Sequence, residues 1–195
     1  MKYTFVFYVL FLFSCVSSKN DGEQKVDQTA KNQSQITKDS IEISQSNEYK
    51  RLVSFLNWYK NGHEELYLPI VEKETGSGES YYAYIDTSIA QQLLNRYRKS
   101  GYFTEYYIQQ DSLYIEEAKK AYQPRDLEIY DYFDHDFILQ TQEIEETLNE
   151  IPELTILPKQ SNLKKGEIAV SIGGSQHLCY VFIKEKGELK LNAIK

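Results

Sequence analysis

The densest group of ionisable side chains in the sequence is Asp134-His135-Asp136. Carboxylates beside an imidazole are the residue types of a metal site or an acid–base pair. On a strand, however, residues 134 and 136 share one face while residue 135 points to the other, so the three side chains converge only at a bend. The alternative is a turn in which the carboxylates accept backbone N–H bonds or cap a helix that begins near Thr141. We favour the turn.

A second pair with reactive side chains is His177 and Cys179. They are two residues apart on a predicted strand, so their side chains lie on the same face. This arrangement would suit a cysteine nucleophile with its base, or one half of a metal site. A metal site needs three or four ligands, and the sequence offers no evident partner cluster. A lone cysteine among apolar neighbours is typically a small buried side chain. We therefore predict no catalytic residue, no metal site and no cofactor, and the glycines match neither a P-loop nor a dinucleotide-binding fingerprint.

Tyrosine is the most unusual feature of the composition, with 17 residues against 9 Phe and 1 Trp. Its apolar ring and polar hydroxyl suit binding surfaces. Equally, such side chains can form the rim of a modest core, with their hydroxyls in water. The predicted binding surface comprises Trp58, Tyr82, Tyr84, Tyr106, Asp134 and Asp136.

The amino terminus is predicted to be a signal peptide of the lipoprotein type. Lys2 is followed by an apolar run from Tyr3 to Phe13, which matches a signal-peptide core and is too short to span a bilayer. The stretch Leu12-Phe13-Ser14-Cys15 resembles a bacterial lipobox, although Phe13 is larger than the residue usual there. We predict cleavage of residues 1–14 and acylation of Cys15, which anchors the protein in a membrane of the bacterial cell envelope, at the outer membrane or the periplasmic face.

Residues 15–47 are predicted to form a lipid-anchored, disordered tether. Residues 16–47 contain no aromatic side chain and consist mostly of Ser, Lys, Asn, Asp, Gln, Glu and Thr. Such a segment buries too little apolar surface to offset its chain entropy. A lesser alternative is an edge strand formed by Ile36, Ile41 and Ile43. The domain is predicted to occupy residues 48–195.

The charge of the chain limits its partners. The formal net charge is −7, and the lysines and acids of residues 1–47 balance, so the domain carries all of it. An acidic domain argues against nucleic acid, whose binding depends on neutralising phosphates. It argues equally against electrostatic docking on anionic lipid. Contact with the membrane is expected only through the N-terminal lipid.

Helices come first and strands later, the order typical of an α+β domain with an antiparallel sheet. Caps are expected at Ser46 or Asn47, and at Ser88 through a capping box with Gln91. Gly62 suits the left-handed position after the first helix, and the second helix is expected to end at Gly101. The predicted helices are residues 47–61, 88–101, 104–122 and 141–151. The predicted extended segments are residues 66–71, 81–85, 127–133, 154–157, 168–172, 178–183 and 189–194, with a hairpin turn at 185–188.

Two stretches resemble a known family. Val53-Ser54-Phe55-Leu56-Asn57-Trp58-Tyr59 and the segment from Asp134 to Glu143 are similar to motifs of bacterial lipoproteins of domain-of-unknown-function family 3828, with Phe137 where the family pattern has proline and Glu143 where it has aspartate. The resemblance implies a nuclear-transport-factor-2-like (cystatin-like) cone, in which helices pack in the hollow of a curved antiparallel sheet. It implies no chemistry, since the family has no established general function. Cone domains often pair, so a homodimer is among the expected assemblies.

These observations favour a non-enzymatic, envelope-anchored binding module for a protein or small ligand. A close alternative is an immunity or inhibitor lipoprotein that neutralises a basic envelope toxin. A third is a cone-fold hydrolase or isomerase, because folds of this kind host such enzymes, although fold alone does not carry function.

Overall fold

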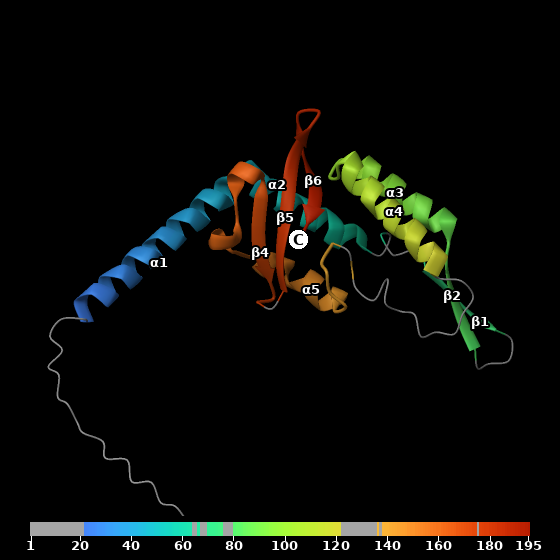
Figure 1. Cartoon of the computed structure of the whole chain (residues 1–195), viewed down its shortest axis with the longest axis horizontal. Coiled ribbons are helices and arrows are strands. Elements are labelled where there is room, and N and C mark those ends of the chain that lie inside the picture. Colours follow the sequence, from blue (N-terminus) through green and yellow to red (C-terminus); the bar gives the residue numbers. More distant parts are fainter. Residues whose placement is uncertain are drawn as a thin grey trace, which may run out of the picture. The chain divides into compact units, whose positions relative to one another are not determined.

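The computed structural model describes residues 22–63, 66, 70–75, 80–121, 136, 138–174 and 176–195 (Figure 1). The signal peptide, Cys15, Asp134, His135 and the strand expected at 127–133 lie outside the described residues. The chain divides into two units, Met1–Gln35 and Ile36–Lys195. Helix α1, Gly22–Gln45, crosses the boundary between them, and the other described helices and strands belong to the second unit.

Helix α1, Gly22–Gln45, replaces the disordered tether predicted for these residues, so that prediction is wrong here. Residues 36, 39, 40 and 43 are the less exposed positions, and their spacing is that of one helical face. Ile43, only 5% exposed, belongs to the hydrophobic core, so the edge-strand alternative is also wrong. Because this segment is polar, it cannot form a hydrophobic core by itself. It can still form a helix that packs a narrow stripe of side chains against a core built by other segments.

Helix α2, Asn47–Gly62, follows the predicted range closely. The Ser46 hydroxyl accepts the N–H of Tyr49 at 3.1 Å and caps the helix. Gly62 was expected in a left-handed position but lies inside the helix, and His63 is the C-cap in right-handed conformation. The buried stripe of α2 is Leu52, Phe55, Leu56 and Tyr59.

Helices α3, Thr87–Ser100, and α4, Glu105–Ala121, confirm two further predictions. Gly101 ends α3 in the left-handed region, with φ of 69°. The N-cap is Asp86, whose carboxylate accepts the N–H groups of Ser88 and Ile89, so the expected capping box at Ser88 is wrong. Asp86 is the stronger acceptor, because an ionised carboxylate stabilises a helix N-terminus better than a hydroxyl.

The strands that the structure describes form two antiparallel sheets. β1, Ile70–Thr75, pairs with β2, Ser80–Ile85. The second sheet has four strands in chain order and follows a short helix, α5, Ile144–Glu150. Its strands are β3 (Thr155–Ile156), β4 (Glu167–Ile172), β5 (Gln176–Glu185) and β6 (Glu188–Ile194).

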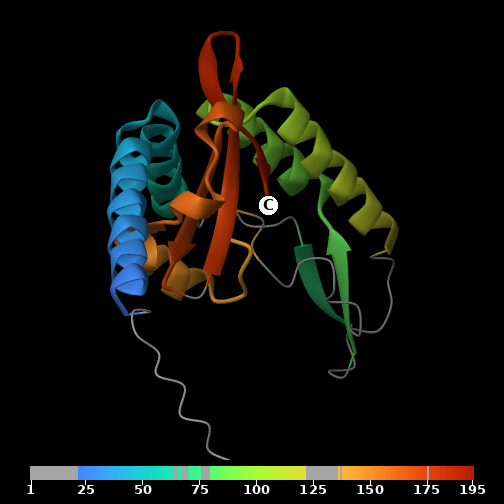
Figure 2. The same ribbon diagram turned by 60° about the vertical axis from the view of Figure 1, so that its left-hand side comes forward.

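The predicted hairpin between β5 and β6 is confirmed. Lys186 and Gly187 both have positive φ, 54° and 87°, as a tight two-residue hairpin turn requires. The Phe182 N–H still donates to Gly166 O at 2.8 Å, and from Ile183 onward β5 pairs with β6. The hairpin extends past β4 (Figures 1 and 2).

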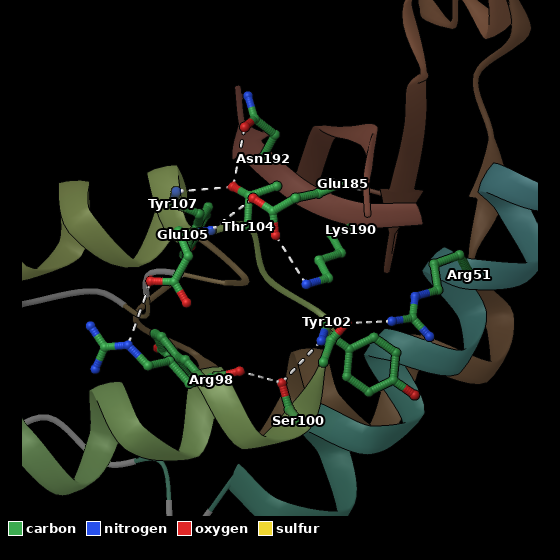
Figure 3. A network of polar contacts seen from close by, with 12 residues as sticks. Arg51, Arg98, Ser100, Tyr102, Thr104, Glu105, Tyr107, Glu185, Lys190 and Asn192 are labelled. Carbon is green, nitrogen blue, oxygen red and sulfur yellow. Dashed lines mark hydrogen bonds and ion pairs between the residues drawn. The ribbon is translucent and has the colours of Figure 1, made fainter. Parts of the chain in front are cut away.

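The corner between α3 and α4 is tied to the outer edge of β6. Phe103 forms a parallel bridge with Leu191, in which the Leu191 N–H donates to Tyr102 O at 2.7 Å and the Thr104 N–H donates to Leu191 O at 2.9 Å. Arg51 on α2 donates to Gly101 O at 2.6 Å (Figure 3). These bonds position the start of α4 against the sheet.

The core of this unit is aromatic at its centre. Phe55 on α2 contacts Trp58, Tyr102, Phe103 and Tyr180, with ring centroids 5.5 to 6.2 Å apart. Because Tyr180 lies on β5, this cluster joins α2 to the four-stranded sheet. The α+β class predicted from the order of elements is confirmed.

Gly166 provides a test of this packing. It has φ of 69°, and a Cβ there would lie 2.0 Å from the backbone oxygen of Phe182, at the irregularity in the β5–β6 pairing. We expect Gly166→Ala to lower the free energy of unfolding by about 3 kcal/mol, because left-handed strain and a backbone clash add together.

The matched control is Gly174→Ala. Gly174 has φ of 76° but open space around its Cβ position, so only the left-handed strain of about 1 kcal/mol applies. Urea unfolding of both variants measures the difference, and equal losses would contradict the close approach at Gly166.

Candidate functional site

The segment from Asp136 to Thr141 is a tight turn organised by one carboxylate. The Asp136 carboxylate accepts the N–H groups of Ile138 at 2.8 Å and Leu139 at 2.6 Å, and the Tyr59 hydroxyl donates to it. The Asp136 N–H donates to Thr141 O at 2.8 Å. The interpretation of Asp136 as a turn former is therefore confirmed.

Two side chains of β5 hold the same turn. Gln176 Nε2 donates to Leu139 O at 3.0 Å and to Gln140 O at 2.6 Å. The Tyr180 hydroxyl donates to Ile138 O at 3.0 Å. The turn thus joins α2, through Tyr59, to the sheet.

The electrostatics of Asp136 suit this structural role. Burial raises the pKa of its carboxyl, while hydrogen bonds from the Tyr59 hydroxyl and from the Leu139 and Ile138 amides act in the opposite direction. The pKa of Tyr59 is raised by burial and by the adjacent Asp136, so the phenol remains a hydrogen-bond donor.

A cavity of about 280 Å³ lies between α4, β6 and this turn. α4 contributes Tyr106, Tyr107, Gln110 and Asp111, β6 contributes Asn192, Ala193 and Ile194, and the turn contributes Gln140. The side chains of Gln110, Asp111, Gln140 and Asn192 are polar, and the other lining residues are aromatic or aliphatic. Polar groups that converge beside apolar surface are typical of small-ligand sites. We call this cavity the Asp111 pocket.

Asp111 is the charged residue among the described residues that line this pocket. Its Oδ2 atom is buried and has no hydrogen-bond partner among the described residues. Burial raises the pKa of the carboxyl from 3.8 to about 7, with no opposing contribution from a cation. Tyr97 and Tyr107 face it as hydroxyls, and burial followed by the charge of Asp111 raises the pKa of both.

Asn192 is oriented at the opposite wall by a short relay (Figure 3). The Thr104 hydroxyl accepts the Tyr107 N–H at 3.0 Å and donates to Asn192 Oδ1 at 3.1 Å. Since the hydroxyl proton is directed to Oδ1, the amide orientation of Asn192 is fixed. Thr104 therefore both caps α4 and positions a pocket residue.

The network around the start of α4 extends onto the hairpin. Glu185 accepts the Glu105 N–H at 3.3 Å and pairs with Lys190 at 3.0 Å. Arg98 on α3 pairs with Glu105 at 3.6 Å (Figure 3). These half-buried and exposed pairs hold α3, α4 and the hairpin together around the pocket wall, though each contributes little alone.

The described residues of the predicted binding surface do not lie together at one site. Tyr106, 56% exposed, lies at the Asp111 pocket. Trp58 packs on the aromatic cluster and lines a different cavity of about 240 Å³, together with Arg96, Lys99 and Ser100. Asp136 lines neither cavity. Tyr82 and Tyr84 lie on β2, but their side chains, like all of Asp134, fall outside the described part.

Asp111 and Tyr107 were missed by the sequence reasoning. Tyr107, Asp111, Ile115 and Ala118 follow the spacing of one helical face, and the three apolar members are buried. A lone aspartate on an otherwise apolar helical stripe was the available signal, since burying a charge is costly unless it is paired. The spacing alone gave no indication that a cavity adjoins it.

The pair His177 and Cys179 lies on β5, where the side chain of His177 is exposed. Cys179 is half-buried on β5, and burial raises the pKa of its thiol, which disfavours a nucleophilic thiolate. Within the described residues, no three His, Cys, Asp or Glu side chains gather as a metal site would require.

No family model, curated protein or solved structure matches this chain. Among the helices that the structure describes, none is long and apolar enough to cross a membrane.

Asp111 makes a specific prediction for stability against pH. Because its folded pKa of about 7 exceeds its ordinary 3.8, the folded state binds the extra proton between these values. Its contribution to stability is therefore full below pH 4 and is lost as pH rises through 7. At about 1.4 kcal/mol per pKa unit, the loss is at most about 4 kcal/mol.

Asp111→Asn should remove this dependence. We expect it to match the parent near pH 4 and to exceed its free energy of unfolding at pH 8 by about 2–4 kcal/mol. Glu117→Gln, an exposed position on the same helix, is the control and should leave the pH profile unchanged. Urea unfolding from pH 4 to 8 measures both, and parallel profiles for the parent and Asp111→Asn would contradict the burial of an uncompensated carboxyl.

Proposed function

We propose that this protein is an envelope-anchored lipoprotein whose α+β domain binds a small polar ligand in the Asp111 pocket. The observation that carries the proposal is the buried, unpartnered Oδ2 of Asp111 beside a cavity. A carboxyl in that position destabilises the fold near neutral pH, and such groups cluster at functional sites. A ligand that pairs with it would recover the lost stability.

The walls of the pocket define the kind of ligand. Its volume of about 280 Å³ is at the lower end of ligand sites, so the ligand is smaller than a typical drug molecule. The carboxyl and the amides of Gln110 and Asn192 offer both donors and acceptors, while Tyr106, Ala193 and Ile194 supply apolar contact. The ligand therefore combines a small apolar body with a few hydrogen-bonding groups.

We also propose that the domain is a nuclear-transport-factor-2-like cone. Support comes from the helix-first order of elements and from α2, which packs on the sheet through the contact between Phe55 and Tyr180. The proposal is consistent with a pocket beside the sheet, but it supplies no chemistry of its own.

The pocket can be tested with a thermal-shift screen of small metabolites on the full-length protein. We expect a compound that raises the melting temperature saturably, because it binds only the folded state. Ala193→Leu should fill the pocket and weaken that compound at least tenfold, whereas Thr155→Leu, at an exposed position on β3, should leave its affinity unchanged.

Two results would contradict this proposal. One is a screen with no stabilising compound; the other is full affinity in Ala193→Leu. If in-cell crosslinking then recovers one envelope or toxin protein in stoichiometric amount, the immunity or inhibitor alternative takes its place.

The anchor is tested through the two cysteines of the chain. We expect Cys15→Ser to abolish incorporation of labelled palmitate and to release the protein from the membrane fraction, because the thiol carries the diacylglycerol. Cys179→Ser is the matched control and should remain labelled and membrane-bound. Membrane retention of Cys15→Ser would contradict lipid anchoring at that residue.

One observation favours a second candidate, a cone-fold hydrolase or isomerase. The pKa of Asp111, about 7, is the value expected of a general acid or base at neutral pH. If the protein is such an enzyme, the ligand found in the screen should be converted to a product on incubation with the protein, and Asp111→Asn should abolish this conversion. Recovery of the unchanged ligand after prolonged incubation with the parent protein favours the binding module.

A further inference from the structure

The charge balance of the Asp111 pocket narrows the class of ligand, an argument that rests on the proposed function. No Lys, Arg or His is among the described residues that line it. The only formal charge that the described lining can present is the carboxylate of Asp111. We infer that the pocket binds a small organic cation, a protonated amine with an apolar body, whose ammonium group pairs with the carboxylate of Asp111.

The groups that face Asp111 from each neighbouring element support this class. Tyr107 on α4 and Tyr97 on α3 are its titratable neighbours, and both stay neutral because burial raises the pKa of each phenol. β6 presents Asn192, Ala193 and Ile194, and the turn presents Gln140, none of them charged. An anionic ligand would meet an uncompensated carboxylate, so like-charge repulsion disfavours it.

Aromatic side chains at the pocket add to the preference for a cation. Tyr106 is exposed at the cavity and Tyr107 is buried in its wall. The face of an aromatic ring attracts ammonium groups, most strongly where water is excluded. A carboxylate beside tyrosines therefore suits an ammonium group that carries an apolar substituent.

The donor set fits an organic cation better than a metal ion. Ca²⁺ takes roughly six to eight oxygen ligands, usually several from carboxylates. The described lining contributes one carboxylate, and the other oxygens come from neutral amides and phenols. One carboxylate is sufficient for an ammonium ion, whose three N–H donors can also reach amide oxygens.

The test is binding of three probes of similar shape to the full-length protein at pH 8, measured by NMR titration. The probes are benzylammonium, benzyl alcohol and benzoate. We expect benzylammonium to bind at least tenfold more tightly than benzyl alcohol, and benzoate to bind weakest. Because the carboxyl titrates with a pKa of about 7, benzylammonium affinity should be roughly tenfold lower at pH 6 than at pH 8.

Three variants show which residues are responsible for benzylammonium binding. Asp111→Asn, which preserves shape, should reduce benzylammonium affinity at least tenfold and remove its dependence on pH. Tyr106→Ala, at an exposed position, should weaken benzylammonium severalfold while leaving the fold intact. Glu117→Gln removes one negative charge elsewhere on α4 and should leave binding unchanged.

The outcomes separate this inference from the proposed function. If benzyl alcohol or benzoate binds as tightly as benzylammonium, or if Asp111→Asn keeps full affinity for benzylammonium, the cation class is overturned and the pocket stands. If no probe binds while the metabolite screen yields a neutral or anionic ligand, the cation class is likewise overturned and the pocket remains a ligand site. If neither the probes nor the screen yields binding, the proposed function fails as well.

Discussion

The carboxylate of Asp136 is the interaction on which the described domain most depends. It takes hydrogen bonds from the Tyr59 hydroxyl of α2 and from two amides of its own turn, and β5 holds the same turn through Gln176 and Tyr180. Removal of one donor from such a buried network leaves the carboxylate with an unmet hydrogen bond, which costs more than the net value of one hydrogen bond. The position of α2 over the sheet and the shape of the turn are therefore linked.

Asp111 is the contrasting case in the same domain. Both carboxyls are buried and both have a raised pKa. Asp136 is surrounded by donors that oppose the shift, whereas for Asp111 burial acts without such opposition. The Asp136 carboxylate, which accepts hydrogen bonds from its surroundings, stabilises the fold. The Asp111 carboxylate has an oxygen without a described partner beside a cavity, and it is therefore available to a ligand. This difference, rather than the density of acids in the sequence, separates the structural carboxyl from the candidate functional one.

Much of the fold could be predicted from local patterns. The helical stripe of α2, the end of α3 at Gly101 and the β5–β6 turn depend on neighbouring residues, and each lies where the sequence predicts it. Helix α1 could not be predicted from its composition, since the use of Ile43 depends on a core built by other segments. The cap of α3 was assigned to Ser88 because a hydroxyl and a glutamine matched the capping-box spacing, but the carboxylate two residues earlier takes the N–H groups.

The site was harder to predict because it depends on tertiary packing. Tyrosine content indicated a binding surface, yet Tyr59, Tyr97, Tyr107 and Tyr180 are buried, and Trp58 and Tyr106 line different cavities. Which face of a strand or helix meets a cavity is decided by elements distant in the sequence, such as the bridge between Phe103 and Leu191. Asp136 was interpreted correctly because a turn is local; Asp111 was missed because its environment comes from α3 and β6 as well as α4.

The central claim is that Asp111 titrates as a buried, uncompensated carboxyl, and ¹³C NMR of its side-chain carboxyl against pH measures this directly. The Asp111 resonance, assigned by its loss in Asp111→Asn, should titrate with a midpoint near 7 in the ligand-free protein. A midpoint near the ordinary value of 3.8 would mean that the carboxyl is solvated or paired. It would then provide no reason to place a ligand at this pocket.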